Sequence, residues 1–192
     1  MDAQRLSAFL LIGGFATLVL SFLLGPPGMA QTYHPPDPQR RIKIIEKYKR
    51  RWNISQLLIG LSILLTALGF AVLASRLSAL VNAWVPGLGA AAILVGAIPV
   101  TLFIYRQTID PLGSYEGTYS GMVTLYSWLA MAGLLLFGVA FLQAGLPAWL
   151  GYLSAGSAIV YTIFFLVTGN GWLAPFLITL LGLLTAIVLL RQ

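Results

Sequence analysis

The chain has 192 residues and a net charge of +6, from eleven Lys or Arg against five Asp or Glu. Hydrophobic residues make up 59% of it and charged residues 8%, and the mean hydropathy is +0.91. Soluble domains carry about 25% charged residues, so this composition excludes an ordinary soluble domain and predicts an integral membrane protein. The absence of cysteine excludes disulfides, thiolate metal ligands and cysteine nucleophiles.

Six apolar segments are long enough to cross a bilayer as helices, since about 20 helical residues span the hydrocarbon core. They cover about residues 6–25, 54–75, 80–105, 121–143, 146–168 and 172–190. The third is ambiguous at its start, between Ala79 and Pro86, because Val85-Pro86-Gly87 is compatible with a helix start or a kink. We see no internal repeat or linker, so we expect one all-α transmembrane domain over residues 1–192, a six-helix bundle.

The first segment allows a second interpretation, as a cleavable signal peptide. Gly28-Met29-Ala30 before Gln31 resembles the small-residue site at which such peptides are cut. The apolar run before it is longer than a typical signal core. We therefore expect a retained spanning helix.

Short turns join the last three segments, at Ala144-Gly145 and at Gly169-Asn170-Gly171. Tight links of this kind favour antiparallel neighbours, so these three helices are predicted to pack as a hairpin set. Pro99 and Pro175 each remove a backbone donor and are predicted to bend the third and sixth spans. Small residues recur on one side of several spans and favour close helix packing; they are Gly89, Ala92, Gly96, Ala130, Gly133, Gly151, Ala155 and Ala158.

Seven of the eleven cations lie in one short run, RRIKIIEKYKRRW, from Arg40 to Trp52. They are Arg40, Arg41, Lys43, Lys47, Lys49, Arg50 and Arg51. With six spans, this run and Arg106 lie on one side of the membrane, and Arg5, Arg76 and Arg191 lie on the other. The positive-inside rule then predicts a cytoplasmic basic loop and two external termini.

The basic run also has helical periodicity, over about residues 39–52. Ile44, Ile45, Tyr48 and Trp52 gather on one side of a helical wheel, and most of the cations lie opposite. This pattern is typical of a helix in the membrane interface that favours anionic lipids. Plain topogenic charge and a dock for an acidic partner protein remain the alternatives. Nucleic acid is not an expected partner, because a short basic run beside a membrane is not a folded reading module.

Two loops on the same side carry the remaining candidate polar residues. The Pro-rich stretch Tyr33-His34-Pro35-Pro36-Asp37-Pro38 holds the single histidine, and we interpret it as a rigid spacer. One His with one carboxylate is not a metal-ligand set, so we expect neither a metal nor a cofactor. Arg106, Asp110 and Glu116 in the next loop, together with His34 and Asp37, define a hypothetical head-group or small-molecule site.

The apolar segments themselves contain no Asp, Glu, Lys, Arg or His. An intramembrane proton relay or acid–base pair therefore lacks its residues. Hydroxyl and amide side chains remain in the spans, and we expect them to bond back to the helices. They are Thr17, Ser21, Gln56, Ser62, Thr66, Thr101, Ser127, Ser154, Ser157, Tyr161, Thr162, Thr179 and Thr185.

The stretch FGVAFLQAGLPAWLGYLSAG, with its Gly-Leu-Pro-x-Trp-Leu-Gly turn, and the closing LLTAIVLLR carry a resemblance. They are similar to the C-terminal part of uncharacterised small six-span bacterial membrane proteins, and Gly25-Pro26-Pro27 is similar to their first loop. The resemblance covers mainly the last third of the chain. It implies a prokaryotic inner-membrane protein without implying an activity.

Three functions stay open from the sequence. A non-catalytic accessory or scaffold subunit of a membrane complex, with other membrane proteins as partners, fits the missing intramembrane charge. A carrier or channel for an apolar or uncharged solute needs the hydroxyls to converge on a cavity. An enzyme acting on lipid head groups needs the loop carboxylates and His34 to meet.

Overall fold

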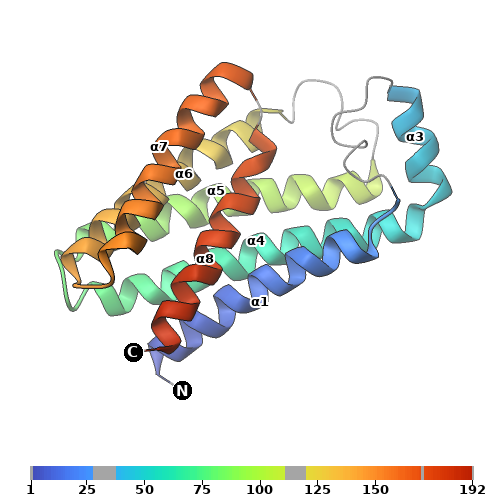
Figure 1. Ribbon diagram of the computed structural model, residues 1–192. Helices are drawn as coiled ribbons and strands as arrows, with labels where there is room; N and C mark the ends of the chain where they lie inside the picture. Colours follow the sequence, from blue (N-terminus) through green and yellow to red (C-terminus); the bar gives the residue numbers. More distant parts are fainter. Residues whose placement is uncertain (1, 28–37, 111–119, 170, 192) are drawn as a thin grey trace.

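The computed structural model describes residues 2–27, 38–110, 120–169 and 171–191, and every regular element in these ranges is a helix. Within these ranges six long apolar helices are of membrane-spanning length, which confirms the six predicted apolar helices (Figure 1). They are α1 (Ala3–Leu24), α4 (Lys49–Leu77), α5 (Trp84–Ile109), α6 (Ser120–Gln143), α7 (Ala148–Thr168) and α8 (Ala174–Leu190). Two short elements complete the described chain, α3 (Pro38–Lys47) and the 3-10 turn η1 (Gly171–Leu173).

The long helices pack in chain order, but the last one does not continue the series. α1 packs on α4, α4 on α5, α5 on α6 and α6 on α7, whereas α8 packs mainly on α1 and barely touches α7. The rings of Phe22 and Phe176 lie 5.2 Å apart across the α1–α8 interface. The expectation of a three-helix hairpin set therefore holds for α6 and α7 and is wrong for α8.

The linker between α7 and α8 explains why α8 does not pack along α7. Gly169 ends α7 with a left-handed φ of 67°, and Gly171 then sits so close to α6 that an added Cβ would lie 2.7 Å from Val123 Cγ1. The Ser127 hydroxyl donates to the Gly171 carbonyl at 3.2 Å. The Trp172 ring lies 6.0 Å from that of Phe103 in α5. The start of α8 is thus held by α5 and α6, and its remaining length runs to α1.

Glycines bring the backbones of α5, α6 and α7 together. An added Cβ at Gly133 would lie 2.8 Å from the Gly89 carbonyl oxygen, and one at Gly138 would lie 2.8 Å from that of Gly151. Three of these four glycines belong to the predicted small-residue stripes, and Gly138 is an additional one. In lipid there is no hydrophobic driving force for helix association, so helices gain stability from the dispersion contacts that such a close approach allows.

α1 and α4 are joined by hydroxyls that cross the interface. Ser62 Oγ donates to the Gly14 carbonyl at 2.7 Å, and Ser7 Oγ donates to the Gly69 carbonyl at 2.9 Å. Both serines are fully buried. These bonds, with Gly14 and Gly69 opposite them, make α1–α4 an interface without intervening space.

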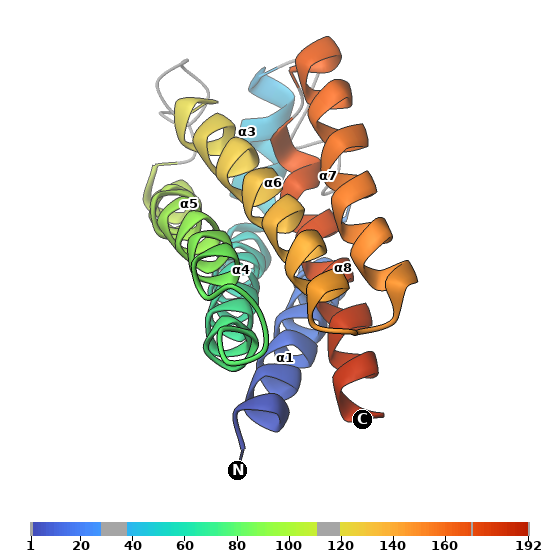
Figure 2. The ribbon, with the colours of Figure 1, turned by 90° about the vertical axis from the view of Figure 1, so that its left-hand side faces the viewer.

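The first span begins, and the last span ends, at the same end of the bundle. The Gln4 side chain donates to the Leu189 carbonyl, and Figures 1 and 2 place both chain ends opposite α3. This arrangement is the one that an even number of spans requires.

Two boundaries differ from the sequence prediction. The expected basic helix over about residues 39–52 is divided into two. α3 ends at Lys47 and α4 begins at Lys49, and Tyr48 between them is not helical, with φ −121° and ψ 31°. Pro175 stands in the first turn of α8, where its missing N–H needs no helical partner, so the predicted bend at this residue is wrong. Pro99 does lie inside α5.

Candidate functional site: a basic end and a lateral groove

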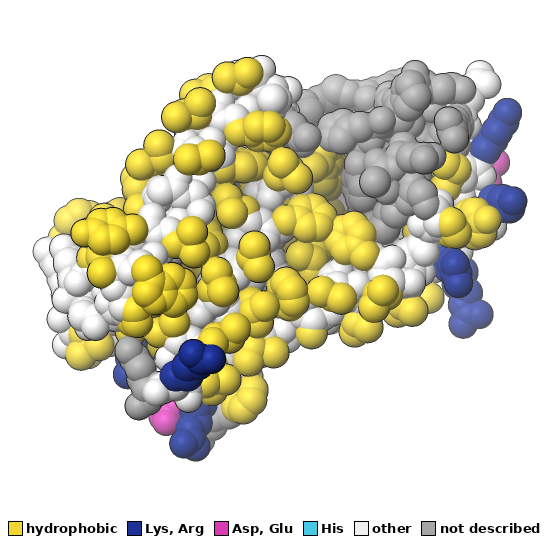
Figure 3. Space-filling model, viewed as in Figure 1, with side chains coloured by type: hydrophobic (Ala, Val, Ile, Leu, Met, Phe, Trp, Pro, Cys, Tyr) yellow, Lys and Arg dark blue, Asp and Glu magenta, His cyan; other side chains and the backbone are white. Residues whose placement is uncertain are grey.

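Charged side chains gather at the two ends of the bundle, and hydrophobic side chains cover the face between them (Figure 3). Large hydrophobic residues exposed on α7 and α8 include Val160, Val167 and Leu180. Such an apolar belt bounded by charged ends is what a bilayer requires of a spanning bundle. The two ends and the belt therefore hold the candidate interaction surfaces.

The basic end lies opposite the chain termini. Lys43 and Lys47 of α3 are exposed, as are the three cations in the first turn of α4, Lys49, Arg50 and Arg51. We refer to these five residues as the basic end. Arg40 and Arg41 lie in the first turns of α3.

Aromatic and aliphatic residues between these cations are tied into the protein. Trp52 is 0% exposed, and its indole Nε1 donates to the Gln107 carbonyl of α5 at 3.2 Å. Ile45 of α3 is only 3% exposed. The Lys47 ammonium lies 5.5 Å from the centre of the Tyr48 ring. Ile45 and Trp52, expected on a membrane-facing side, are both buried, and Trp52 joins the start of α4 to the end of α5.

The hypothetical head-group site is described only in part. Arg106 is exposed in the last turn of α5, and Asp110 caps that helix, with its backbone N–H donating to the Arg106 carbonyl at 2.8 Å. His34, Asp37 and Glu116 lie outside the described residues. Within the described ranges, no three His, Cys, Asp or Glu side chains come together as metal ligands would.

The hydroxyls of the spans mostly return to their own helices. Thr17, Ser21, Ser127, Thr162, Thr179 and Thr185 each donate to a carbonyl three or four residues earlier. Ser7 and Ser62 bond across to a neighbouring helix. These bonds are the packing role that the sequence predicts for such groups.

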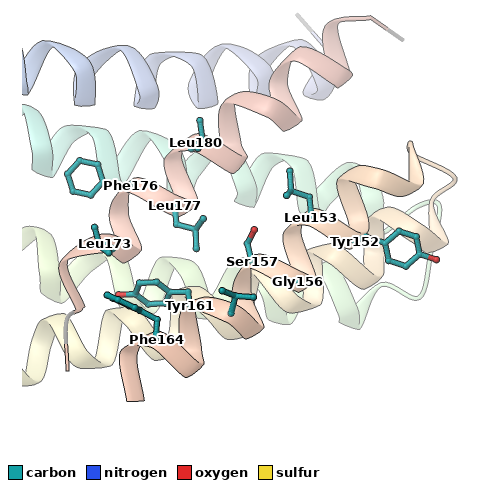
Figure 4. A pocket seen from close by; sticks show the side chains of 11 residues that line it. Tyr152, Leu153, Gly156, Ser157, Tyr161, Phe164, Leu173, Phe176, Leu177 and Leu180 are labelled. Carbon is teal, nitrogen blue, oxygen red and sulfur yellow. The ribbon is translucent and has the colours of Figure 1, made fainter. Parts of the chain in front are cut away.

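A groove between α7 and α8 is one of the hollows that the described residues line, and sequence reasoning missed it. Its volume is about 680 Å³, and it is walled by Leu153, Gly156, Ser157 and Phe164 of α7 and by Leu177 and Leu180 of α8 (Figure 4). A smaller hollow of about 320 Å³ lies between α6 and α7, beside Trp128, Met131 and Ile159. Both are almost entirely apolar. Periodicity cannot reveal such a groove, because the same apolar residues serve packing and lipid contact.

The glycines distinguish the groove from the packed interfaces. Nothing lies within 4 Å of a Cβ added at Gly156, whereas a Cβ at Gly151, on the same helix, would meet Leu142 Cγ at 2.6 Å. The Tyr161 hydroxyl is hydrogen-bonded with the Ser127 side chain and the Ala174 backbone. This contact joins α6, α7 and the start of α8 near the linker.

The described part of the chain is thus all-helical, with six apolar helices of membrane-spanning length, a strongly basic end and a lateral apolar groove. No family model, curated protein or solved structure matches the chain.

Proposed function

We propose that this protein is a non-catalytic multi-pass protein of a prokaryotic inner membrane, acting as an accessory or scaffold subunit. The observation that carries the proposal is the basic end, where exposed cations lie next to Trp52, which is buried and hydrogen-bonded to α5. A cluster of exposed cations at the membrane suits recognition of an acidic partner, because complementary charge speeds the encounter of two proteins and disfavours wrong partners. The resemblance of residues 137–156 to small bacterial membrane proteins supports the prokaryotic setting.

The basic end is proposed to face the cytoplasm. It holds five exposed cations, and the opposite end carries Arg5, Arg76 and Arg191. Cations close to the ends of spanning helices bias orientation toward the cytoplasm. Both termini are then external.

α3 is proposed to lie as an amphipathic helix at the cytoplasmic surface. Lys43 and Lys47 are exposed, whereas Ile45 between them is buried. Each cation near an anionic leaflet contributes about 1 kcal/mol of binding free energy. Acidic lipids would therefore gather around α3 and the first turn of α4 and form part of the docking surface.

The test is a pull-down of the tagged protein from its own membranes in a mild detergent, followed by mass spectrometry. The variant is Lys43→Gln with Lys47→Gln, which leaves Lys49, Arg50 and Arg51 beside the span to maintain orientation. We expect a stoichiometric membrane-associated partner with the unchanged protein and its loss with the variant, because two exposed cations of the docking surface are removed.

The matched control neutralises exposed cations at the other end, as Arg5→Gln with Arg191→Gln. The partner should be retained in that control. Recovery of the unchanged protein without any stoichiometric partner contradicts a subunit role. Equal loss in both variants contradicts docking through the basic end.

A further inference from the structure

We propose that two connections between helices, α4–α5 and α6–α7, are immersed in the layer of lipid head groups and anchor this end of the bundle there. They are residues 78–83 and 144–147, and Figure 1 shows both at the end opposite α3, which we call the terminal end. The inference concerns the end that the proposed docking surface does not use, and it does not depend on the subunit role. It requires only that the six long apolar helices span a membrane.

The side chains of these connections are those of an interfacial surface. Neither connection contains a charged residue. Leu80 in the first connection and Trp84 at the start of α5 are both more than half exposed, and Trp149 near the start of α7 is half exposed. Tryptophan is enriched where a membrane meets water, because its ring is apolar and its N–H still finds a polar partner there.

The register of α5 against α6 fixes the depth of Trp84. Gly89 and Gly133 lie opposite each other, since an added Cβ at Gly133 would be 2.8 Å from the Gly89 carbonyl oxygen. Trp84 precedes Gly89 by five residues. Because the two helices are antiparallel, Trp84 is level with Gly138, which follows Gly133 by five residues. It therefore lies about 8 Å beyond the glycine contact, toward the terminal end.

Trp149 lies at nearly the same depth on the other side of α6. An added Cβ at Gly138 would be 2.8 Å from the Gly151 carbonyl oxygen, so these two residues are opposite each other. Trp149 is two residues, or about 3 Å, from Gly151. Trp84 and Trp149 thus share one level on two helices that both pack on α6. A boundary parallel to the membrane meets both at once, whereas a partner helix along the membrane normal would follow one helix across many depths.

The distance between the two ends of the bundle matches a bilayer. An added Cβ at Gly60 of α4 would be 3.3 Å from Thr101 Cγ2 of α5. Counted from this contact, Arg76 of α4 is level with the start of α5, within one residue of Trp84. From Trp52, beside the basic end, to Arg76 is 24 residues, or about 36 Å. This exceeds the hydrocarbon core of about 30 Å and is less than the bilayer with its head groups, about 40–45 Å. With the basic end in one head-group layer, Arg76 and Trp84 lie in the other.

The backbone of both connections suits this depth, because many of its N–H groups are bonded within the chain. The N–H groups of residues 78–81 donate to carbonyls in the last turns of α4, at 2.8 to 3.1 Å. In the second connection Gly145 has a left-handed φ of 70°, and the N–H groups of Ala144 and Leu146 donate back to α6 at 2.9 and 3.1 Å. Pro147 has no N–H. Such connections need less water than an open loop does.

The test places one fluorescent label at each connection of the full chain, reconstituted in vesicles of phosphatidylethanolamine and phosphatidylglycerol. The chain has no cysteine, so Leu80→Cys and Ala148→Cys each carry a single label. Val95→Cys is the control, because Val95 is as exposed as Leu80 but lies 11 residues, or about 16 Å, from Trp84 toward the bilayer centre. Three quenchers are compared: a phospholipid with a nitroxide on its head group, one with a nitroxide near the end of its acyl chain, and aqueous iodide.

We expect the labels at positions 80 and 148 to lose most of their fluorescence to the head-group nitroxide and little to the other two quenchers. The label at position 95 should lose most of its fluorescence to the acyl-chain nitroxide. The two test labels report on different connections, so a variant that does not fold leaves the other to decide.

Three results overturn the proposal. Quenching of the test labels by iodide without quenching by the head-group nitroxide means that the connections project into water. Quenching by the acyl-chain nitroxide, as at position 95, means that they lie in hydrocarbon. Protection from all three quenchers means that a second copy or another protein covers them.

Discussion

The α1–α4 pair and the α7–α8 pair each consist of two consecutive spans, yet the first pair packs closely and the second leaves a groove. α1 and α4 are separated by 24 residues of sequence between Leu24 and Lys49, including α3, and still form the most extensive interface of the bundle. α7 and α8 are separated only by a short linker and η1, and enclose a groove. A short linker therefore does not by itself bring two consecutive helices into close contact. The α1–α4 pair has Gly14 and Gly69 at its contact and two hydroxyl bonds across it.

Gly14→Leu should produce the largest effect, because it breaks the closed interface. An added Cβ at Gly14 would overlap the Thr66 hydroxyl and lie 3.2 Å from the Ser62 carbonyl oxygen. Overpacking of this kind costs about 3 kcal/mol of unfolding free energy. Equilibrium unfolding in mixed micelles, followed by circular dichroism, measures the change.

Gly156→Leu is the matched control for that prediction, since it makes the same chemical change on the open pair. With no atom within 4 Å of the new Cβ, the expected change is within about 0.5 kcal/mol. Any gain in helix propensity applies to both variants, so the difference between them isolates packing. Equal effects at the two glycines would show that the interfaces do not differ as described.

Ser62→Ala should have a smaller effect on the same closed interface. It removes the hydroxyl that donates to the Gly14 carbonyl at 2.7 Å and leaves the backbone contact in place. Hydrogen bonds between membrane helices are worth about 0.6 kcal/mol on average and at most about 1.7 kcal/mol. We expect a loss of about 1 kcal/mol in the same unfolding measurement, and no loss would mean that this bond adds nothing to α1–α4.

The sequence predicts much of this fold because its strongest signals are physical requirements of the bilayer. Apolar length identifies all six spans, and Gly145 and Gly169 both adopt the left-handed φ that the predicted turns favour. Gly89, Gly133 and Gly151 lie at close helix contacts, as the small-residue stripes suggest.

What the sequence does not reveal is which apolar face meets which partner. Trp52 has the pattern of a membrane-facing aromatic residue and is instead buried against α5. Gly151 and Gly156 are equivalent as small residues, but Gly151 lies against Leu142 and Gly138 of α6, whereas Gly156 has open space beside it. A helix face that contacts lipid and one that contacts protein have the same apolar periodicity. The groove, and the contact of Trp52 with α5, could therefore be recognised only in the tertiary structure.

Cysteine cross-linking in native membranes tests most directly whether α7 and α8 stay apart while another pair of helices is closed, because the chain contains no other thiol. Gly96→Cys with Leu129→Cys probes the closed α5–α6 interface, where an added Cβ at Gly96 lies 3.2 Å from Leu129 Cβ. Leu153→Cys with Leu180→Cys probes the two walls of the groove. After oxidation, the remaining thiols are counted with a mass-tagged maleimide.

A disulfide needs Cβ atoms within about 4.5 Å. We therefore expect the α5–α6 pair to lose its thiols and the α7–α8 pair to keep them. Equal cross-linking of the two pairs would mean that α7 and α8 close on each other in the membrane, and would contradict the open interface between them.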